Sequence, residues 1–217
     1  MARKLPIRLT GRVRSALVQR HPKKGEELIV LSRKLEPSDS VEESIQGTML
    51  DARFAFRGGR FEELAAALGT AGTQYLQYGC PRGAIPFFED AVKLFHVTGN
   101  KLGETVQLYH LGMAHSEVNN PRRAAKYYTR ALATSVDAGE VKTCALVGLG
   151  DAHLQRRDFA GATGYLLPAA VTARDRGMDR LLDRCRTSLE KCATELGRSK
   201  FASVCARAGI SRDEVGL

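Results

Sequence analysis

Residues 108–132 read LYHLGMAHSEVNNPRRAAKYYTRAL and contain two stretches with helical periodicity. Apolar or ring-bearing side chains recur three or four positions apart on either side of Asn119-Asn120-Pro121, which predicts two amphipathic helices joined by a turn. Small side chains at Gly112 and Ala124 would let the helix axes approach closely where they cross. The stretch therefore predicts a helical hairpin, with the ring of Tyr128 filling the space between successive hairpins.

The same pattern occurs three times along the chain, with spacings of 40 and then 38 residues. Five columns keep this register: a glycine (Gly72, Gly112, Gly150), a ring (Tyr75, His115, His153), an alanine (Ala84, Ala124, Ala162), a bulky residue (Phe88, Tyr128, Leu166) and a second alanine (Ala91, Ala131, Ala169). A period of this length is typical of repeat proteins built from supersecondary units. The sequence therefore predicts an all-α chain of repeated helical hairpins.

The pattern L-G-x-x-aromatic, followed by A-x-x-x-F and a further alanine, resembles the tetratricopeptide repeat over roughly residues 62–176. The unit is longer than the standard repeat, lacks a tryptophan at its start and lacks a closing proline. In these respects it is similar to the longer variant found in kinesin light chain and Pins-like adaptors. The resemblance implies a right-handed α-solenoid in which the first helix of each hairpin lines a concave groove that binds protein.

The repeat and its flanks give the expected organisation of the chain. Its parts are a basic N-terminal arm (1–24), a degenerate first hairpin (25–59), three repeats (60–99, 100–138 and 139–176), a capping helix (177–197) and a C-terminal tail (198–217).

Local signals support these flanking elements. A capping box formed by Ser40 and Glu43 predicts a helix over about 41–57 that ends at Gly58-Gly59, and residues 25–35 are helical in composition and would be its partner. An apolar stripe along 181–196 predicts the capping helix, which covers the exposed face of the last repeat. Pro168 predicts a bend near 164–168. The tail is expected to be a short helix followed by a loose end.

The resemblance also names the residues that would face the groove. They are Leu76, Gln77, Val106, Tyr109, Met113, Glu117, Val147, Asp151, Leu154 and Gln155. Family members that grip the acidic tails of chaperones carry lysine and asparagine where Gly69 and Thr73 stand here, so that carboxylate clamp is absent. The mostly apolar groove suits an amphipathic helix or an extended apolar segment. The open alternative is that a neighbouring helix of the chain, or residues 197–217, fills it.

No constellation of residues predicts catalysis, a metal site or a cofactor. His115 and His153 occupy the ring column and are expected to pack between helices. Cys185 and Cys192 lie seven residues apart on one helical face, which predicts burial. No CxxC or HxxxH spacing supplies four zinc ligands, and no glycine run matches a phosphate loop. We therefore predict a protein that is not an enzyme and has no small-molecule substrate.

The net charge of +9 belongs almost entirely to the N-terminus. Residues 1–34 hold ten basic side chains against Glu26 and Glu27, whereas the rest of the chain carries 23 basic and 22 acidic side chains. The cations of the arm are Arg3, Lys4, Arg8, Arg12, Arg14, Arg20, Lys23 and Lys24. They predict salt-sensitive attraction to an acidic partner, either nucleic acid or the acidic tails of tubulin. Organelle targeting and a merely solvated end are the other interpretations. Residues 1–53 contain no aromatic side chain on which bases could stack.

The expected function is that of a non-catalytic scaffold or adaptor within a larger complex. It would bind a peptide or helix in its groove and an acidic partner through its arm, within a cytoskeletal or ciliary, microtubule-associated assembly. The alternative is a nucleic-acid-associated, ribonucleoprotein subunit. No stretch approaches the roughly 18 apolar residues of a membrane span, and five scattered cysteines favour a reducing compartment, so an intracellular, cytoplasmic or cytoskeletal location is expected.

Overall fold

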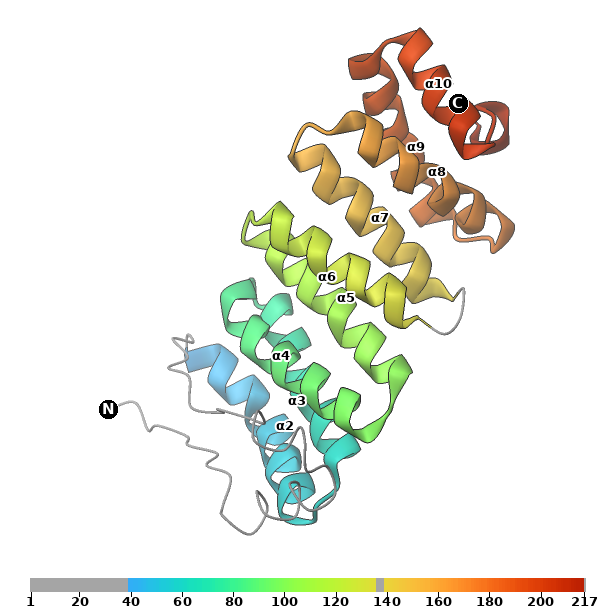
Figure 1. Ribbon diagram of the computed structural model, residues 1–217. Coiled ribbons are helices and arrows are strands. Elements are labelled where there is room, and N and C mark those ends of the chain that lie inside the picture. Colours follow the sequence, from blue (N-terminus) through green and yellow to red (C-terminus); the bar gives the residue numbers. More distant parts are fainter. Residues whose placement is uncertain (1–38, 136–138, 217) are drawn as a thin grey trace. The chain divides into compact units, whose positions relative to one another are not determined.

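The computed structural model of the chain describes residues 39–135 and 139–216. These residues form nine α-helices and one 3-10 helix, and none of them lies in a strand, which confirms the all-α prediction (Figure 1). In chain order the helices are α2 (Asp39–Arg57), α3 (Phe61–Gln77), α4 (Pro81–Thr98), α5 (Lys101–Glu117), α6 (Pro121–Thr134), α7 (Glu140–Gln155), α8 (Phe159–Asp175), α9 (Asp179–Leu196), α10 (Arg198–Ala208) and η2 (Asp213–Val215).

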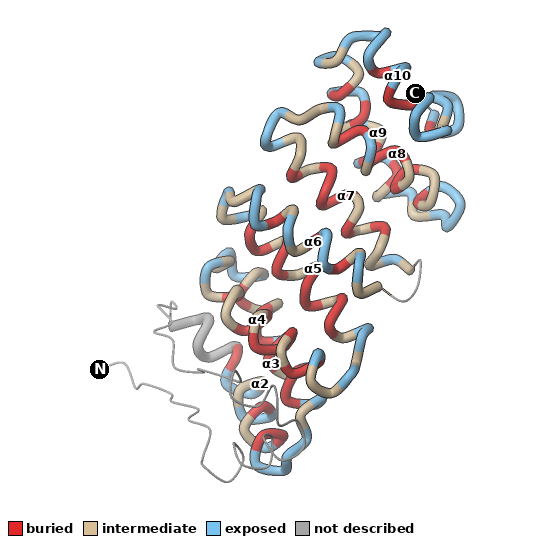
Figure 2. Tube along the Cα trace, in the orientation of Figure 1, coloured by how far each residue is buried: buried red, intermediate tan, exposed pale blue. Residues whose placement is uncertain are grey.

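Two compact units divide the chain, Met1–Ala114 and His115–Leu217. In the first unit, α3 packs against both α2 and α4. In the second, α7 packs against α6 and α8, and α9 packs against α8. Within each unit, helices that follow one another in the sequence are therefore neighbours in space, and each buries a row of side chains (Figure 2). This packing of consecutive helices is the one expected of repeated hairpins.

Glycines at the helix crossings let bulky side chains of the paired helix lie against the backbone. A Cβ atom at Gly72 of α3 would lie 2.6 Å from the ring of Phe88 in α4. A Cβ atom at Gly150 of α7 would lie 2.6 Å from Cγ of Leu166 in α8. Because interiors are close-packed, a larger side chain at either position would force the helices apart. The two hairpins thus use the predicted glycine and bulky columns in the same way.

The bulky column also reaches the following hairpin. The ring of Tyr128 in α6 packs on Gly148 of α7. The ring of Phe88 stacks on His110 of α5, with 5.2 Å between the ring centroids. His110 and Gly148 are 38 residues apart and so occupy equivalent positions. The prediction that Tyr128 fills the space between successive hairpins is confirmed.

A pair of rings in contact recurs in all three hairpins, stacked in the first two and tilted in the third. The pairs are Tyr75–Phe87, His115–Tyr127 and His153–Tyr165, with centroid distances of 5.2, 5.2 and 5.1 Å. Both members of each pair keep the spacings of 40 and 38 residues. The prediction that His115 and His153 pack between helices is confirmed, and their ring partners form a further column that the sequence analysis missed.

The turns within the hairpins share one backbone geometry. Their central residues have positive φ: Gly79 (69°), Asn119 (56°) and Arg157 (59°). The next N–H donates back to the first helix, from Cys80 to Tyr75 O (2.9 Å), from Asn120 to His115 O (2.8 Å) and from Asp158 to His153 O (2.9 Å). These bonds close the first helix of each hairpin in the same way.

The N-terminal boundary differs from the prediction. Helix α2 begins at Asp39, so Ser40 lies inside its first turn and is not the N-cap. The helix ends at Arg57, and Gly59 follows with a φ of 68°, which matches the predicted glycine stop. The predicted partner segment, residues 25–35, and the basic arm lie outside the described residues.

The C-terminal tail is not loose. Helix α9 buries Leu182, Cys185, Leu189 and Cys192 against the last hairpin, as the predicted stripe requires. Helix α10 then packs on α8 and α9, and η2 packs on α8 with Val215 fully buried. Arg186 Nε donates to Val215 O at 2.8 Å and ties the end of the chain to α9. The tail therefore extends the core of the second unit, which corrects the expectation of a loose end.

Proline does not end the helices that contain it. Helix α8 continues through Pro168, as α4 continues through Pro86. The hydroxyl of Thr172 donates to Pro168 O at 2.8 Å. The bend near 164–168 stays a prediction.

The close crossing can be tested with two glycine substitutions in one hairpin. We expect Gly150→Ala to lower the free energy of unfolding by about 1–3 kcal/mol, because its Cβ would overlap Leu166. Gly164→Ala, on an exposed helical position with nothing within 4 Å, should raise it by about 0.5–1 kcal/mol through helix propensity alone. Urea unfolding measures both. If Gly150→Ala were as stabilising as Gly164→Ala, the crossing would not limit the packing.

Candidate functional site

The predicted groove residues lie on α3, α5 and α7, the first helices of the three hairpins. Their side chains differ in accessibility. Six are half-buried (Leu76, Val106, Tyr109, Met113, Asp151 and Leu154), three are exposed (Gln77, Glu117 and Gln155) and one, Val147, is fully buried. Because the residues are divided between the two units, the faces of the first and second units are described separately.

In the first unit, α3 and α5 meet directly at a glycine. A Cβ atom at Gly69 would lie 2.7 Å from Nε2 of Gln107, so the amide of that glutamine rests on the backbone of α3. One turn further along α3, the hydroxyl of Thr73 donates to Gly69 O at 3.0 Å, which satisfies that hydroxyl within its own helix. The meeting point of α3 and α5 is thus built from a glycine, a threonine and an amide, without a charge.

Helix α5 carries an apolar stripe beside this meeting point, which we call the α5 stripe: Leu102, Val106, Tyr109 and Met113. The spacing of four, three and four residues puts the four side chains on one face of the helix. Leu102 is 72% exposed, and the other three are half-buried. The sequence analysis missed Leu102, although it lies four residues before Val106 on the same face. An exposed leucine that continues a partly buried stripe indicates a surface for an apolar ligand.

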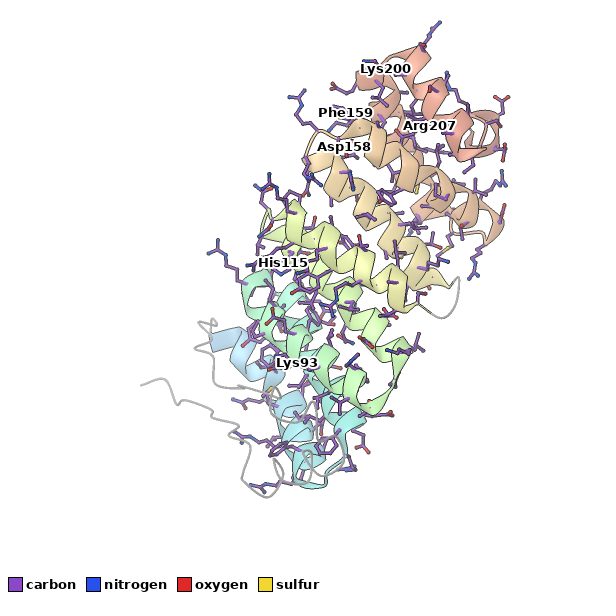
Figure 3. The ribbon with its side chains drawn as sticks, in the orientation of Figure 1. Lys93, His115, Asp158, Phe159, Lys200 and Arg207 are labelled. Atoms are coloured by element: carbon purple, nitrogen blue, oxygen red, sulfur yellow. The ribbon has the colours of Figure 1, made fainter. Side chains whose placement is uncertain are left out.

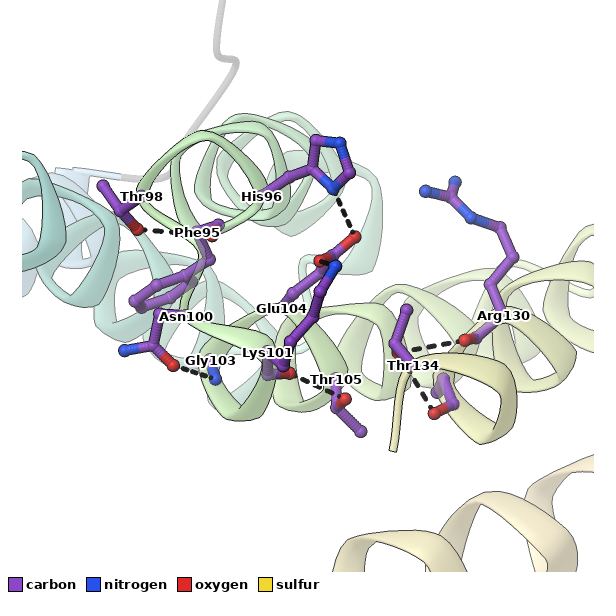
Figure 4. Close-up of polar contacts among 11 residues, drawn as sticks. Phe95, His96, Thr98, Asn100, Lys101, Gly103, Glu104, Thr105, Arg130 and Thr134 are labelled. Carbon is purple, nitrogen blue, oxygen red and sulfur yellow. Dashed lines mark hydrogen bonds and ion pairs between the residues drawn. The ribbon is translucent and has the colours of Figure 1, made fainter. Parts of the chain in front are cut away.

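The start of α5 is held firmly, which positions Leu102. The buried carboxylate of Glu104 accepts from Lys101 Nζ at 3.0 Å and lies 3.1 Å from His96 Nδ1 of α4 (Figure 4). Asn100 Oδ1 accepts from the N–H of Gly103 at 2.8 Å and caps the helix (Figure 4). A Cβ at Gly103 would lie 2.6 Å from the ring of Phe95, so the first turn is in close contact with α4.

Gln107 is the unusual residue of the contact between α3 and α5. It is only 8% exposed, and its Oε1 is buried without a hydrogen-bond partner. A buried polar atom left without a partner costs about 1–3 kcal/mol. The equivalent residues of the other repeats are Ala67 and Ala145, which fill the position without a polar group. The repeat therefore does not need an amide here, and this departure from alanine is the signal that the sequence analysis could have used.

His110 keeps the same region uncharged. Its ring stacks on Phe88, and its Nδ1 is buried without a hydrogen-bond partner. Burial lowers the pKa of His110 below its usual value of 6.5, so the ring is neutral at pH 7. This position holds no permanent cation, in keeping with the missing carboxylate clamp.

In the second unit, the corresponding face of α7 is used for packing. Val147 lies wholly within the core around α8, and Leu154 packs against the same core, so the expectation that Val147 contacts a ligand is wrong. Arg184 of α9 forms an ion pair with Asp151, and Gln155 Nε2 donates to Ser116 Oγ at 3.2 Å. Burial raises the pKa of Asp151, and Arg184 opposes that rise. Among the groove candidates, those of the first unit remain the better binding surface.

In the second unit, His153 and Asp158 form a close histidine–carboxylate pair at the turn between α7 and α8. Asp158 lies at the turn before α8 (Figure 3). His153 Nδ1 lies 2.7 Å from its Oδ2. The other oxygen of Asp158 accepts from Gly161 N at 2.9 Å and caps α8. The ring of His153 lies against Tyr165. Each group of the pair therefore has a structural role.

Three buried cysteines of the second unit are poor nucleophiles. Burial raises the pKa of Cys185 to about 12 and also raises the pKa values of Cys192 and Cys205, so these thiols stay protonated at neutral pH. No group of three histidine, cysteine or acidic residues within 39–135 and 139–216 is arranged to hold a metal ion. In the same ranges, no helix has the length and apolarity needed to cross a membrane.

No protein-family model matches the chain, and no protein of curated function is similar to it in sequence. The resemblance to the tetratricopeptide repeat therefore depends on the residue columns themselves. The function must be inferred from the α5 stripe, Gln107 and the charges of the chain.

The cap of α8 gives a pH-dependent prediction. The N–H of Gly161, and then His153, hold the pKa of Asp158 below its usual value. The charged carboxylate therefore stabilises the fold above its unfolded pKa of about 4, and this stabilisation is lost as the pH falls through the lowered folded pKa.

We expect Asp158→Ala to lower the free energy of unfolding by about 1 kcal/mol at pH 7, the usual cost of removing an N-cap. Asp158→Asn should lose less, since Asn120 caps α6 in the same way. Urea unfolding between pH 3 and 7 should show the difference between wild type and Asp158→Asn shrinking below about pH 4. A difference that did not change with pH would assign the effect to something other than the carboxylate charge.

Proposed function

We propose that the chain is a non-catalytic scaffold or adaptor of the tetratricopeptide type, a right-handed α-solenoid that binds a peptide or helix against α3 and α5. The observation that supports this best is the buried, unpartnered Oε1 of Gln107, next to the half-exposed α5 stripe. Natural proteins retain few such atoms, and each calls for an explanation. Because the oxygen is closed to solvent, the amide of Gln107 must turn outward from Gly69 before a ligand can donate to it and provide the missing hydrogen bond.

The chemistry of the face defines the ligand. Leu102, Val106 and Met113 offer apolar contacts, so the ligand would bury one or two apolar anchors there. A main-chain N–H or an amide of the ligand would donate to Gln107. A ligand carboxylate would find no cation, because His110 is neutral. The proposed ligand is therefore an apolar helix or extended segment with a free donor.

The basic arm is the second part of the proposal. Its surplus of cations supports attraction to an acidic partner, for which the acidic tails of tubulin are the candidate. By resemblance to the adaptor-type members, we propose a microtubule-associated assembly, cytoskeletal or ciliary, as its setting. The alternative is a ribonucleoprotein subunit that uses the arm on nucleic acid, which the same charge supports.

The peptide site can be tested with peptides selected on the wild-type chain from a random 12-residue library. We expect Leu102→Glu to weaken their binding at least tenfold without lowering stability, because this side chain is already 72% exposed. Thr70→Glu, exposed on α3 but off the face, is the matched control and should bind as wild type does. Calorimetric titration gives the affinities.

Gln107→Leu separates binding from folding in the same assay. This substitution should raise the free energy of unfolding by about 1 kcal/mol, because it removes an unpaired buried oxygen. It should nevertheless lower the affinity of the chain for the selected peptides. Peptides that bind Leu102→Glu and Gln107→Leu as tightly as wild type would refute the site.

A further inference from the structure

The outward face of α6 carries an unusual concentration of positive charge. Arg122, Arg123, Lys126 and Arg130 are all exposed, and α6 contains no acidic residue. Among the described residues, Arg122, Arg123 and Lys126 take part in no ion pair. We call these four residues the α6 basic face. Four cations within nine residues repel one another, so they cost stability unless something anionic binds them.

The fold itself does not call for these cations. The equivalent residues in the first repeat are Arg82, Gly83, Pro86 and Asp90, and in the third repeat they are Ala160, Gly161, Gly164 and Pro168. The three second helices otherwise share their buried columns. The α6 basic face is therefore a departure from the repeat, like Gln107.

We propose that the α6 basic face binds an acidic polypeptide segment in an extended conformation. The proposal rests on the proposed function in one respect, that the chain docks an acidic partner, and it gives that partner a site besides the arm. Arg122, Lys126 and Arg130 follow one another every four residues, or about 6 Å along the helix. Alternate residues of an extended chain are about 6.6 Å apart on one side, so carboxylates at every second position meet this row.

The face is less suited to nucleic acid. Single strands are held by stacking bases on free aromatic rings as well as by cations. Helix α6 carries two rings, of which Tyr128 is buried. The other, Tyr127, already stacks on His115 at 5.2 Å and lies under the guanidinium of Arg130 at 5.8 Å.

The test uses the full chain with two probes, the peptide (Glu-Ser)6 and the oligonucleotide dT6, in fluorescence anisotropy. The triple variant Arg122→Gln, Lys126→Gln and Arg130→Gln should bind the peptide about tenfold more weakly, the sum of three exposed charge contacts. The control variant Arg176→Gln, Arg180→Gln and Lys191→Gln removes the same charge from exposed sites of the same unit and should lose less than about twofold. Deleting residues 2–24 in wild type measures the arm by itself.

The outcomes separate the arm from α6. Peptide binding that survives the deletion and is lost in the α6 variant supports the proposal. An equal loss in both triple variants would show attraction by net charge alone and would overturn it. Tighter binding of dT6 than of the peptide would overturn it in favour of nucleic acid. Binding lost only with residues 2–24 would leave the arm as the acidic-partner site and would also overturn it.

Discussion

Where two paired helices of this protein cross, the volume of a missing side chain is taken by a bulky residue of the partner helix. Phe88 fills the space at Gly72, and Leu166 fills the space at Gly150. The same bulky position reaches the following hairpin, where Tyr128 meets Gly148. One column of glycines and one of bulky residues therefore determine the packing within a hairpin and the docking of the next. The stacked rings and the positive-φ turns can recur in register because these crossings fix the distance between the helices.

The sequence was sufficient for the features that depend on this repeated packing. The crossing glycines, the packing of His115 and His153 against tyrosine rings, and the burial of Cys185 and Cys192 follow from residue size and spacing, which are visible in a single chain. The features that the sequence did not reveal depend on the helices that follow the last repeat and pack on it. Val147 occupies a groove column, yet the last hairpin and the helices after it enclose it. Val215 is buried because α8 presents an apolar surface to the final residues, which no local pattern near 213–215 reveals.

Departures from the repeat are more informative about function than the repeat itself. The column of Gln107 holds alanine in the other two repeats, so packing requires only a small side chain there. The glutamine therefore serves a purpose other than packing, or it lowers the stability of the fold. The α6 basic face is a departure of the same kind, since its counterparts are mostly glycine, proline and alanine. Three repeats act as internal controls for one another, which partly replaces the comparison with related proteins. The arm could be recognised from composition, whereas both departures required the columns to be aligned first.

Charge separates the two proposed binding surfaces, the uncharged face of α3 and α5 and the α6 basic face. On the face of α3 and α5, Gly69, Thr73 and the α5 stripe carry no charge, and burial keeps His110 neutral. An apolar ligand there would lose little solvation, and an acidic one would gain nothing. The cations stand at exposed positions of α6, where they can attract an anionic segment over about a Debye length, 8–10 Å at physiological salt. Because the first surface works by burial and the second by screened attraction, salt should weaken only the second.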